Sequence, residues 1–225
     1  MATRDDCLAL VLLEEKKAKE AIEKLEKAYP NAAYYLKFAT PIDLVVAAIL
    51  SAQTRDEVVN AITPDLFRKY KTAMDYANAK PQELENLIRG VSFAGNKARN
   101  VISACKIIAE KYNGMVPDRM DELLDLPGIG RKTANTILIN AYNKVEGIPV
   151  DTWVIKLSGR IGLSMGKKPD DIEQDLMRIT DKKHWHNLAY VMKAHGKKIC
   201  HSQVPLCSKC LIKALCPKNN VTKSL

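Results

Sequence analysis

Long apolar runs and export signals are absent from this sequence. No uninterrupted apolar run is longer than Leu44–Leu50, which falls far short of the roughly 18 residues that a membrane-spanning helix needs. Near the N-terminus, Arg4 is followed by Asp5 and Asp6, and no small-residue cleavage site appears. We therefore expect a cytoplasmic, prokaryotic-type protein without a targeting segment, in which the cysteines do not form a disulfide framework.

Segments in which Val, Ile or Thr alternate with polar residues are also scarce, whereas a helical period of apolar residues runs through most of the chain. Thr40 and Pro41 have the character of an N-cap and a first helical residue, so we expect a helix from there to Ser51. No repeat period is present. The sequence predicts an all-α protein with further helices near 7–27, 55–68, 81–89, 95–112, 118–124, 131–142, 152–163, 169–180 and 183–199.

Acidic residues are outnumbered by basic ones. The chain has 35 Lys and Arg residues against 26 Asp and Glu residues, which gives a formal net charge of +9 at pH 7. Such a balance favours a polyanionic partner such as nucleic acid.

Residues 126–135 read Leu-Pro-Gly-Ile-Gly-Arg-Lys-Thr-Ala-Asn and connect two predicted helices. Gly128 and Gly130 permit positive φ and let a phosphate approach the backbone without a Cβ in the way. The N–H groups that begin the second helix attract anions. This pattern is typical of a helix-hairpin-helix, which binds the DNA backbone without reading bases. A plain corner between two helices is the alternative.

Lys132 lies in the first turn of that second helix, where the helix dipole disfavours a cation by roughly 0.3–1 kcal/mol unless an anion offsets it. The dipole, the neighbouring Arg131 and partial desolvation would all lower the pKa of Lys132 from about 10.4, as a lysine nucleophile requires. Asp151 begins the next helix as an N-cap that can face a ligand. A surface lysine and a capping aspartate are each common alone. Their occurrence beside the hairpin favours nucleophilic chemistry.

Four of the six cysteines fall in one C-terminal segment: Cys200, Cys207, Cys210 and Cys216. Zinc sites with four cysteines usually have two Cys-x₂-Cys pairs, whereas only Cys207 and Cys210 form such a pair here. A [4Fe–4S] cluster, which also takes four cysteines, suits this spacing better; zinc and unligated thiols are the alternatives. Cys7 and Cys105 lie on predicted apolar helix faces and are expected in the core.

Together these segments resemble the endonuclease III family of the helix-hairpin-helix DNA glycosylase superfamily, which has an iron–sulfur cluster loop. The resemblance rests on the hairpin sequence, on Val150-Asp151-Thr152 and on the cysteine spacing, and it extends over essentially the whole chain. It implies two helical lobes flanking a DNA-binding cleft. One lobe would be a bundle at 34–144 that carries the helix-hairpin-helix at about 118–142. The other would combine 1–33 with 145–225 and carry Asp151 and the cluster.

The resemblance also implies a base excision repair enzyme that removes oxidised pyrimidines from duplex DNA and has AP lyase activity. Lys132 would attack the sugar C1′, expel the base and form a Schiff base, after which β-elimination would cut the strand. Asp151 would help to deprotonate Lys132 and stabilise charge on the sugar. Gly128, Gly130 and Arg131 would contact DNA, and the cysteine quartet would hold a [4Fe–4S] cluster with a structural or DNA-sensing role.

A base on which an enzyme acts must leave the stack, and something must fill the gap. Ser51-Ala-Gln53-Thr54 resembles the family's gap-filling segment through Gln53, and Phe93 matches its apolar wedge. The alternatives are that Gln53 is a plain loop amide and Phe93 a core aromatic.

Two departures from the family pattern concern the surroundings of Asp151 and the cysteine loop. Trp153 stands where many relatives have His, and the loop His201–Leu206 lacks the usual basic residues. Phosphate contacts near that loop would be weaker or would come from nearby lysines, Lys197, Lys198 and Lys209. The four histidines show no metal-binding pattern beyond the proximity of His201 to Cys200, and none is assigned a role.

Two other functions stay open at this point. A mismatch glycosylase on the same scaffold would remove thymine or adenine; Lys132 and the end of the chain at Leu225 argue against the adenine branch, which lacks the lysine and adds a C-terminal domain. A non-catalytic helix-hairpin-helix DNA-binding protein is disfavoured by the presence of both Lys132 and Asp151. A monomer is expected, because no exposed heptad or large apolar stripe asks for a partner.

Overall fold

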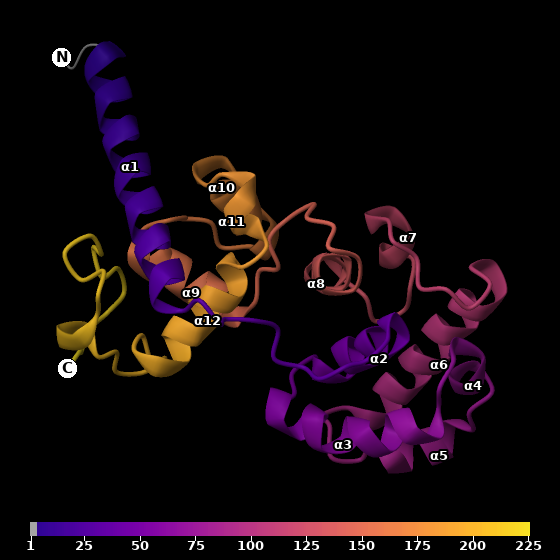
Figure 1. The fold of residues 1–225 in the computed structure, drawn as a ribbon. Helices are drawn as coiled ribbons and strands as arrows, with labels where there is room; N and C mark the ends of the chain where they lie inside the picture. Colours follow the sequence, from indigo (N-terminus) through magenta and orange to yellow (C-terminus); the bar gives the residue numbers. More distant parts are fainter. Residues whose placement is uncertain (1–3) are drawn as a thin grey trace. The chain divides into compact units, whose positions relative to one another are not determined.

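The computed structural model describes residues 4–225, with side chains from Glu15 onward, and this part of the chain contains helices and no strand (Figure 1). The prediction of an all-α protein is therefore confirmed. The chain divides into two compact units: residues up to Ala33 together with Gly147–Leu225, and Tyr34–Glu146. From the sequence, the second of the two boundaries is expected between residues 144 and 145, whereas the structure has it between Glu146 and Gly147. None of the helices in the described part has the length and apolarity that crossing a bilayer requires.

The unit formed by Tyr34–Glu146, called here the hairpin unit, has one continuous apolar core. Within it α2 packs against α3, α6 and α8, while α4 and α5 pack against α6. Its helices are α2 (Pro41–Ser51), α3 (Asp56–Lys69), α4 (Ala73–Ala77), α5 (Pro81–Leu87), α6 (Ala94–Lys111), α7 (Met120–Leu124) and α8 (Arg131–Tyr142).

Helix α2 is the central element of this core. The Thr40 hydroxyl accepts a hydrogen bond from Asp43 N at 3.2 Å, and the Asp43 carboxylate accepts one from Thr40 N at 3.0 Å, so a capping box fixes the start of the helix. Every residue from Ile42 to Leu50 is buried. A helix that is apolar on all sides belongs in a core, which explains why helices pack around α2. The predicted bounds of this helix are confirmed.

The remaining residues form a second unit, called here the cysteine unit. In it α9 packs against α12, and α1 contacts both α10 and α12. Its helices are α1 (Arg4–Ala28), α9 (Thr152–Ile161), α10 (Pro169–Ile179), α11 (Lys182–Trp185) and α12 (Leu188–Lys198), followed by a single 3₁₀ turn at Cys207–Lys209.

The prediction of one helix over 183–199 is wrong, because the chain breaks between α11 and α12. The Trp185 indole N–H donates to Thr180 O at 3.2 Å, and Asn187 N donates to His184 O at 3.2 Å in a tighter turn. These contacts end α11 after Trp185 and redirect the chain before α12 begins at Leu188.

A short helix, α4, was not expected from the sequence. Thr72 and Asp75 form a second capping box, with the Thr72 hydroxyl 3.1 Å from Asp75 N and the Asp75 carboxylate 2.9 Å from Thr72 N. The Thr-x-x-Asp pattern was the available signal. Pro64 lies inside α3 and does not mark a helix boundary.

Candidate functional site

The turn between α7 and α8 is held by two apolar side chains and exposes two glycines. Leu126 and Ile129 are buried, and Ile129 N donates to Leu126 O at 3.0 Å. Gly128 and Gly130 are exposed. The core thus fixes the turn while its glycine backbone faces solvent, where a ligand can reach it.

The two glycines are required for different reasons, Gly128 for its backbone conformation and Gly130 for the open space beside it. Gly128 has φ +85°, and a Cβ there would lie 3.1 Å from the side-chain nitrogen of Asn100. Gly130 has φ −106°, so of the two glycines only Gly128 uses the positive φ that glycine permits. No heavy atom lies within 4 Å of a Cβ built at Gly130. As the N-cap of α8 without a side chain, Gly130 leaves the first-turn N–H groups open to an anion.

Lys132 is the second residue of α8, and its side chain and that of Arg131 are partly buried. The Thr136 hydroxyl donates to Lys132 O at 2.9 Å. The following residues from Ala134 to Ile139 are buried, so the backbone beneath Lys132 is anchored in the core. The structure therefore places a lysine on a rigid helix start beside the open hairpin.

Asp151 is the N-cap of α9, as the sequence predicts. Its Oδ1 accepts hydrogen bonds from Trp153 N at 2.8 Å and from Val154 N at 2.9 Å. Both bonds go to Oδ1, so capping uses one of the two carboxylate oxygens. Lys132 and Asp151 thus each begin a helix, one in the hairpin unit and the other in the cysteine unit.

Trp153, one of the departures from the family pattern, has two neighbours of interest. A Cβ built at Gly196 of α12 would overlap the Trp153 ring. On the other side, Lys156 Nζ lies 5.5 Å from the Trp153 ring centroid and donates to Ser202 Oγ at 2.5 Å. Lys156 therefore brings a positive charge to the loop His201–Leu206, which has no Lys or Arg of its own. No motif in the sequence marks Lys156.

The two candidate gap-filling residues are both exposed and both in the left-handed region. Gln53 has φ +53°, and Phe93 has φ +58° and is 65% exposed. The alternative of Phe93 as a core aromatic is therefore wrong. The Ser92 hydroxyl donates to Gln53 O at 2.9 Å, so the structure brings these two segments together.

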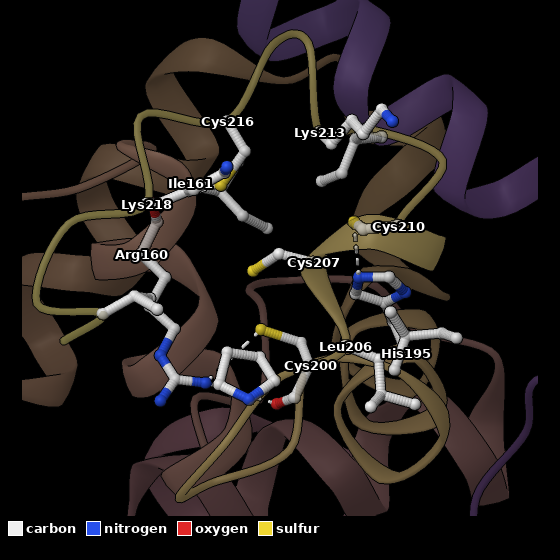
Figure 2. Close-up of a pocket in the computed structure, with 14 residues that line it drawn as sticks. Arg160, Ile161, His195, Cys200, Leu206, Cys207, Cys210, Lys213, Cys216 and Lys218 are labelled. Atoms are coloured by element: carbon white, nitrogen blue, oxygen red, sulfur yellow. Dashed lines mark hydrogen bonds between the residues drawn. The ribbon is translucent and has the colours of Figure 1, made fainter. Parts of the chain in front are cut away.

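All four C-terminal cysteines line one pocket of the cysteine unit, with their sulfur atoms turned toward its interior (Figure 2). Cys200 Sγ lies 3.4 Å from Arg160 Nη1, and Cys210 Sγ lies 3.6 Å from His195 Nε2. Cys216 Sγ donates to Arg160 O at 3.4 Å. The spacing in the sequence thus corresponds to a single cluster of thiols in space.

Burial raises the pKa of the Cys210 and Cys216 thiols and lowers the pKa of His195 to about 4. Within the described residues, no three or more His, Cys, Asp or Glu side chains are arranged to hold a single metal ion. Cys105 is buried in the hairpin unit as predicted. The side chain of Cys7 lies outside the described residues.

Arg160 was missed by sequence reasoning. It is 8% exposed, and its guanidinium donates to three successive carbonyls: Cys200 O at 3.4 Å, His201 O at 2.8 Å and Ser202 O at 2.8 Å. His195, another residue without an assigned role, also accepts or donates a hydrogen bond with Tyr29 OH at 3.0 Å. Neither belongs to a recognisable motif, so only the fold reveals them.

The chain is similar to known proteins over most of its length. The model of the HhH-GPD superfamily base excision DNA repair protein matches residues 46–182. Endonuclease III of Synechocystis sp. is 44% identical over 203 residues, which are 90% of this chain and 93% of the relative. A trapped endonuclease III–DNA covalent intermediate is 37% identical with a TM-score of 0.87, covering 91% of this chain and 96% of that one. A thermostable thymine-DNA glycosylase shares the fold, with a TM-score of 0.77 at 19% identity over 92% of this chain and 97% of that one.

Proposed function

The chain belongs to the HhH-GPD superfamily of base excision DNA repair proteins and, within it, to the endonuclease III family; from this we propose how its residues divide the work. It is a DNA glycosylase of base excision repair that acts on duplex DNA, and the family adds AP lyase activity. We propose oxidised pyrimidines as its substrates. The observation that carries the proposal is Lys132 on the first turn of α8, directly after the open glycine hairpin.

Lys132 is the proposed nucleophile. Its Nζ lone pair forms a bond to C1′ while the glycosidic bond breaks. The electron pair of the broken glycosidic bond leaves with the base, which takes up a proton. The attached nitrogen then gives up one proton, its lone pair forms the C=N bond as the C1′–O4′ bond breaks, and O4′ takes up a proton, which leaves a protonated Schiff base. Removal of a C2′ proton expels the 3′ phosphate and cuts the strand. The anchored backbone of Lys132 gives its side chain a fixed starting point for the attack.

Asp151 is the proposed base and electrostatic partner. Its Oδ1 is held by two N–H groups of α9, which keeps the carboxylate in one orientation. We propose that its other oxygen takes the proton from Lys132 and then stabilises the positive charge that develops on the sugar.

The hairpin is the proposed grip on the DNA backbone. The N–H groups of the first turn of α8, together with the Arg131 guanidinium, would offer donors and positive charge to a phosphate. Gly128 and Gly130 keep Cβ atoms out of its path. Gln53 and Phe93 are the proposed gap fillers, and their exposure supports this role.

We further propose that Cys200, Cys207, Cys210 and Cys216 hold a [4Fe–4S] cluster. A [4Fe–4S] cluster takes four cysteine ligands, and the four cysteines that line one pocket match this number. Zinc sites with four cysteines usually have two Cys-x₂-Cys pairs, and this segment has one. When bound, the cluster supplies a covalent cross-link of the C-terminal loop. Arg160 prepares this loop by fixing its first three carbonyls.

We propose that the protein is located in a bacterial-type cytoplasm, bound to chromosomal DNA. There it acts as a monomer on damaged or abasic duplexes.

A panel of duplexes that contain thymine glycol, dihydrouracil, uracil opposite guanine or thymine opposite guanine tests the substrate class. Base release is measured separately from strand cleavage. Release of thymine glycol and dihydrouracil ahead of both mismatched bases is the expected result. Preference for thymine opposite guanine would overturn the assignment.

A further inference from the structure

Lys97 is a lysine in the interior of the hairpin unit that the proposed chemistry does not use. It lies on α6 and is 5% exposed. Its ammonium donates three hydrogen bonds, to Leu50 O at 2.7 Å, Ala52 O at 2.6 Å and Thr54 Oγ1 at 2.8 Å. An ammonium has three donors, so all of them are used on one short segment.

That segment is the end of α2 and the loop that carries Gln53. Carbonyl groups at the C-terminus of a helix lack partners and carry partial negative charge, so a buried cation is well placed there. Burial lowers the pKa of Lys97, which reflects the cost of keeping it inside. A buried charge of this kind is retained only where its contacts compensate for it.

The same loop is tied to the start of α6. Thr54 Oγ1 also accepts from Ser92 N at 3.1 Å, and the Ser92 hydroxyl donates to Gln53 O at 2.9 Å. Phe93 follows Ser92 directly and begins α6, the helix that carries Lys97. Helices α2 and α6 pack against each other (Figure 1). Gln53 and Phe93 are therefore held by one hydrogen-bonded network.

The backbone at Gln53 and at Phe93, called here the two tips, needs the support of this network. Gln53 and Phe93 have φ of +53° and +58°, a region that bulky residues adopt rarely and only where surrounding contacts determine it. A loop released from these contacts would relax toward negative φ and separate the two tips. Each would then have to be ordered again when it entered DNA.

We propose that Lys97 is a positioning residue that holds Gln53 and Phe93 as one preassembled wedge, and so sets how readily the target base is extruded. The inference rests on the proposed function of these two residues as gap fillers. Lys97 touches neither the base nor the sugar. Its effect is confined to steps in which a base leaves a stacked duplex.

Lys97→Met tests this, because methionine keeps much of the side-chain length and removes the three donors. Base release from a duplex that contains thymine glycol should fall by about tenfold or more. Cleavage of an abasic site in single-stranded DNA should not change, since no base has to be extruded there. Lys106→Met, which removes an exposed lysine from the same helix, is the matched control and should behave as the parent in both assays.

A fluorescence measurement detects insertion of the wedge into DNA separately from base release and strand cleavage. A duplex that contains a stable abasic analogue with neighbouring 2-aminopurine should become fluorescent with the parent protein and much less so with Lys97→Met. If Lys97→Met does not fold, Thr54→Val replaces it, because it removes the shared acceptor at nearly constant volume; the same selective loss is expected.

Equal losses in duplex and single-stranded assays, or no loss in either, would overturn the role of Lys97. A parent protein that unstacks 2-aminopurine but releases no damaged base would count against the proposed function alone. The two failures are therefore distinguishable.

Discussion

The indole ring of Trp153 lies directly on Gly196, so close that a Cβ on residue 196 would overlap the ring. Gly196 is buried inside α12, and Trp153 is in the first turn of α9, whose N-cap is Asp151. Because Gly196 has no side chain, the Trp153 ring fits between α9 and α12, and the two helices can pack closely. Since Trp153 lies two residues after Asp151, this pair connects the packing of α12 to the surroundings of the proposed base.

Gly196→Ala should destabilise the protein by about 1–3 kcal/mol, because the added methyl group overpacks against the ring. Alanine at a helical glycine ordinarily stabilises by roughly 0.5–1 kcal/mol, so the sign of the change identifies the clash. Gly159→Ala is the matched control, since no heavy atom lies within 4 Å of its Cβ, and it should stabilise. Thermal unfolding measures both. A stabilised Gly196→Ala protein would show that the ring does not occupy this position.

Asp151→Asn should separate capping from chemistry. Asparagine caps helices about as well as aspartate, so the free energy of unfolding should change little. Base release should fall by about 10²–10⁴-fold, because the amide cannot take a proton from Lys132. Single-turnover kinetics and thermal unfolding of the same preparation check this. Asp151→Ala should show the same loss of activity and, in addition, a free energy of unfolding lower by about 1 kcal/mol. An Asp151→Asn enzyme with full activity would show that Asp151 has no part in the mechanism.

The two hairpin glycines should respond differently to alanine. Gly128→Ala should destabilise the protein, since φ is +85° and Asn100 lies 3.1 Å from the new Cβ. Gly130→Ala should fold normally, because its φ is −106° and its Cβ position is open, yet bind DNA more weakly. Affinity for an abasic-analogue duplex at several salt concentrations, with thermal unfolding, tests the pair. Full affinity in a stable Gly130→Ala protein would mean that no phosphate approaches this backbone.

Purified protein should be brown, with broad visible absorption and about four iron atoms per chain. Cys207→Ser should lose the colour and part of the iron. Cys105→Ser, which changes a buried cysteine of the other unit, should keep both. A colourless anaerobic preparation that contains zinc would contradict the cluster.

Local rules predicted those elements whose causes are local. The helix from Pro41 to Ser51 follows from its capping box and proline, and the helix from Arg131 to Tyr142 follows from the glycine hairpin before it. The break after Trp185 depends on a bond from its indole to Thr180 O, which no helical period signals.

The same distinction applies to the site. Asp151 caps a helix as its sequence context predicts, because both of its hydrogen bonds lie within three residues. The left-handed backbone of Gln53 could not be predicted, since its loop is held by Ser92 and Lys97, about forty residues further along the chain. Arg160 was missed for the same reason, as its partners lie about forty residues away.

Lys132 carries the central claim, and reductive trapping tests it most directly. With borohydride and a duplex that contains an abasic site, the parent protein should form a covalent adduct with the DNA through the reduced Schiff base. Lys132→Gln should form none, although it still binds an uncleavable abasic-analogue duplex. An adduct that persists in Lys132→Gln would contradict the account, because another amine would then be the nucleophile.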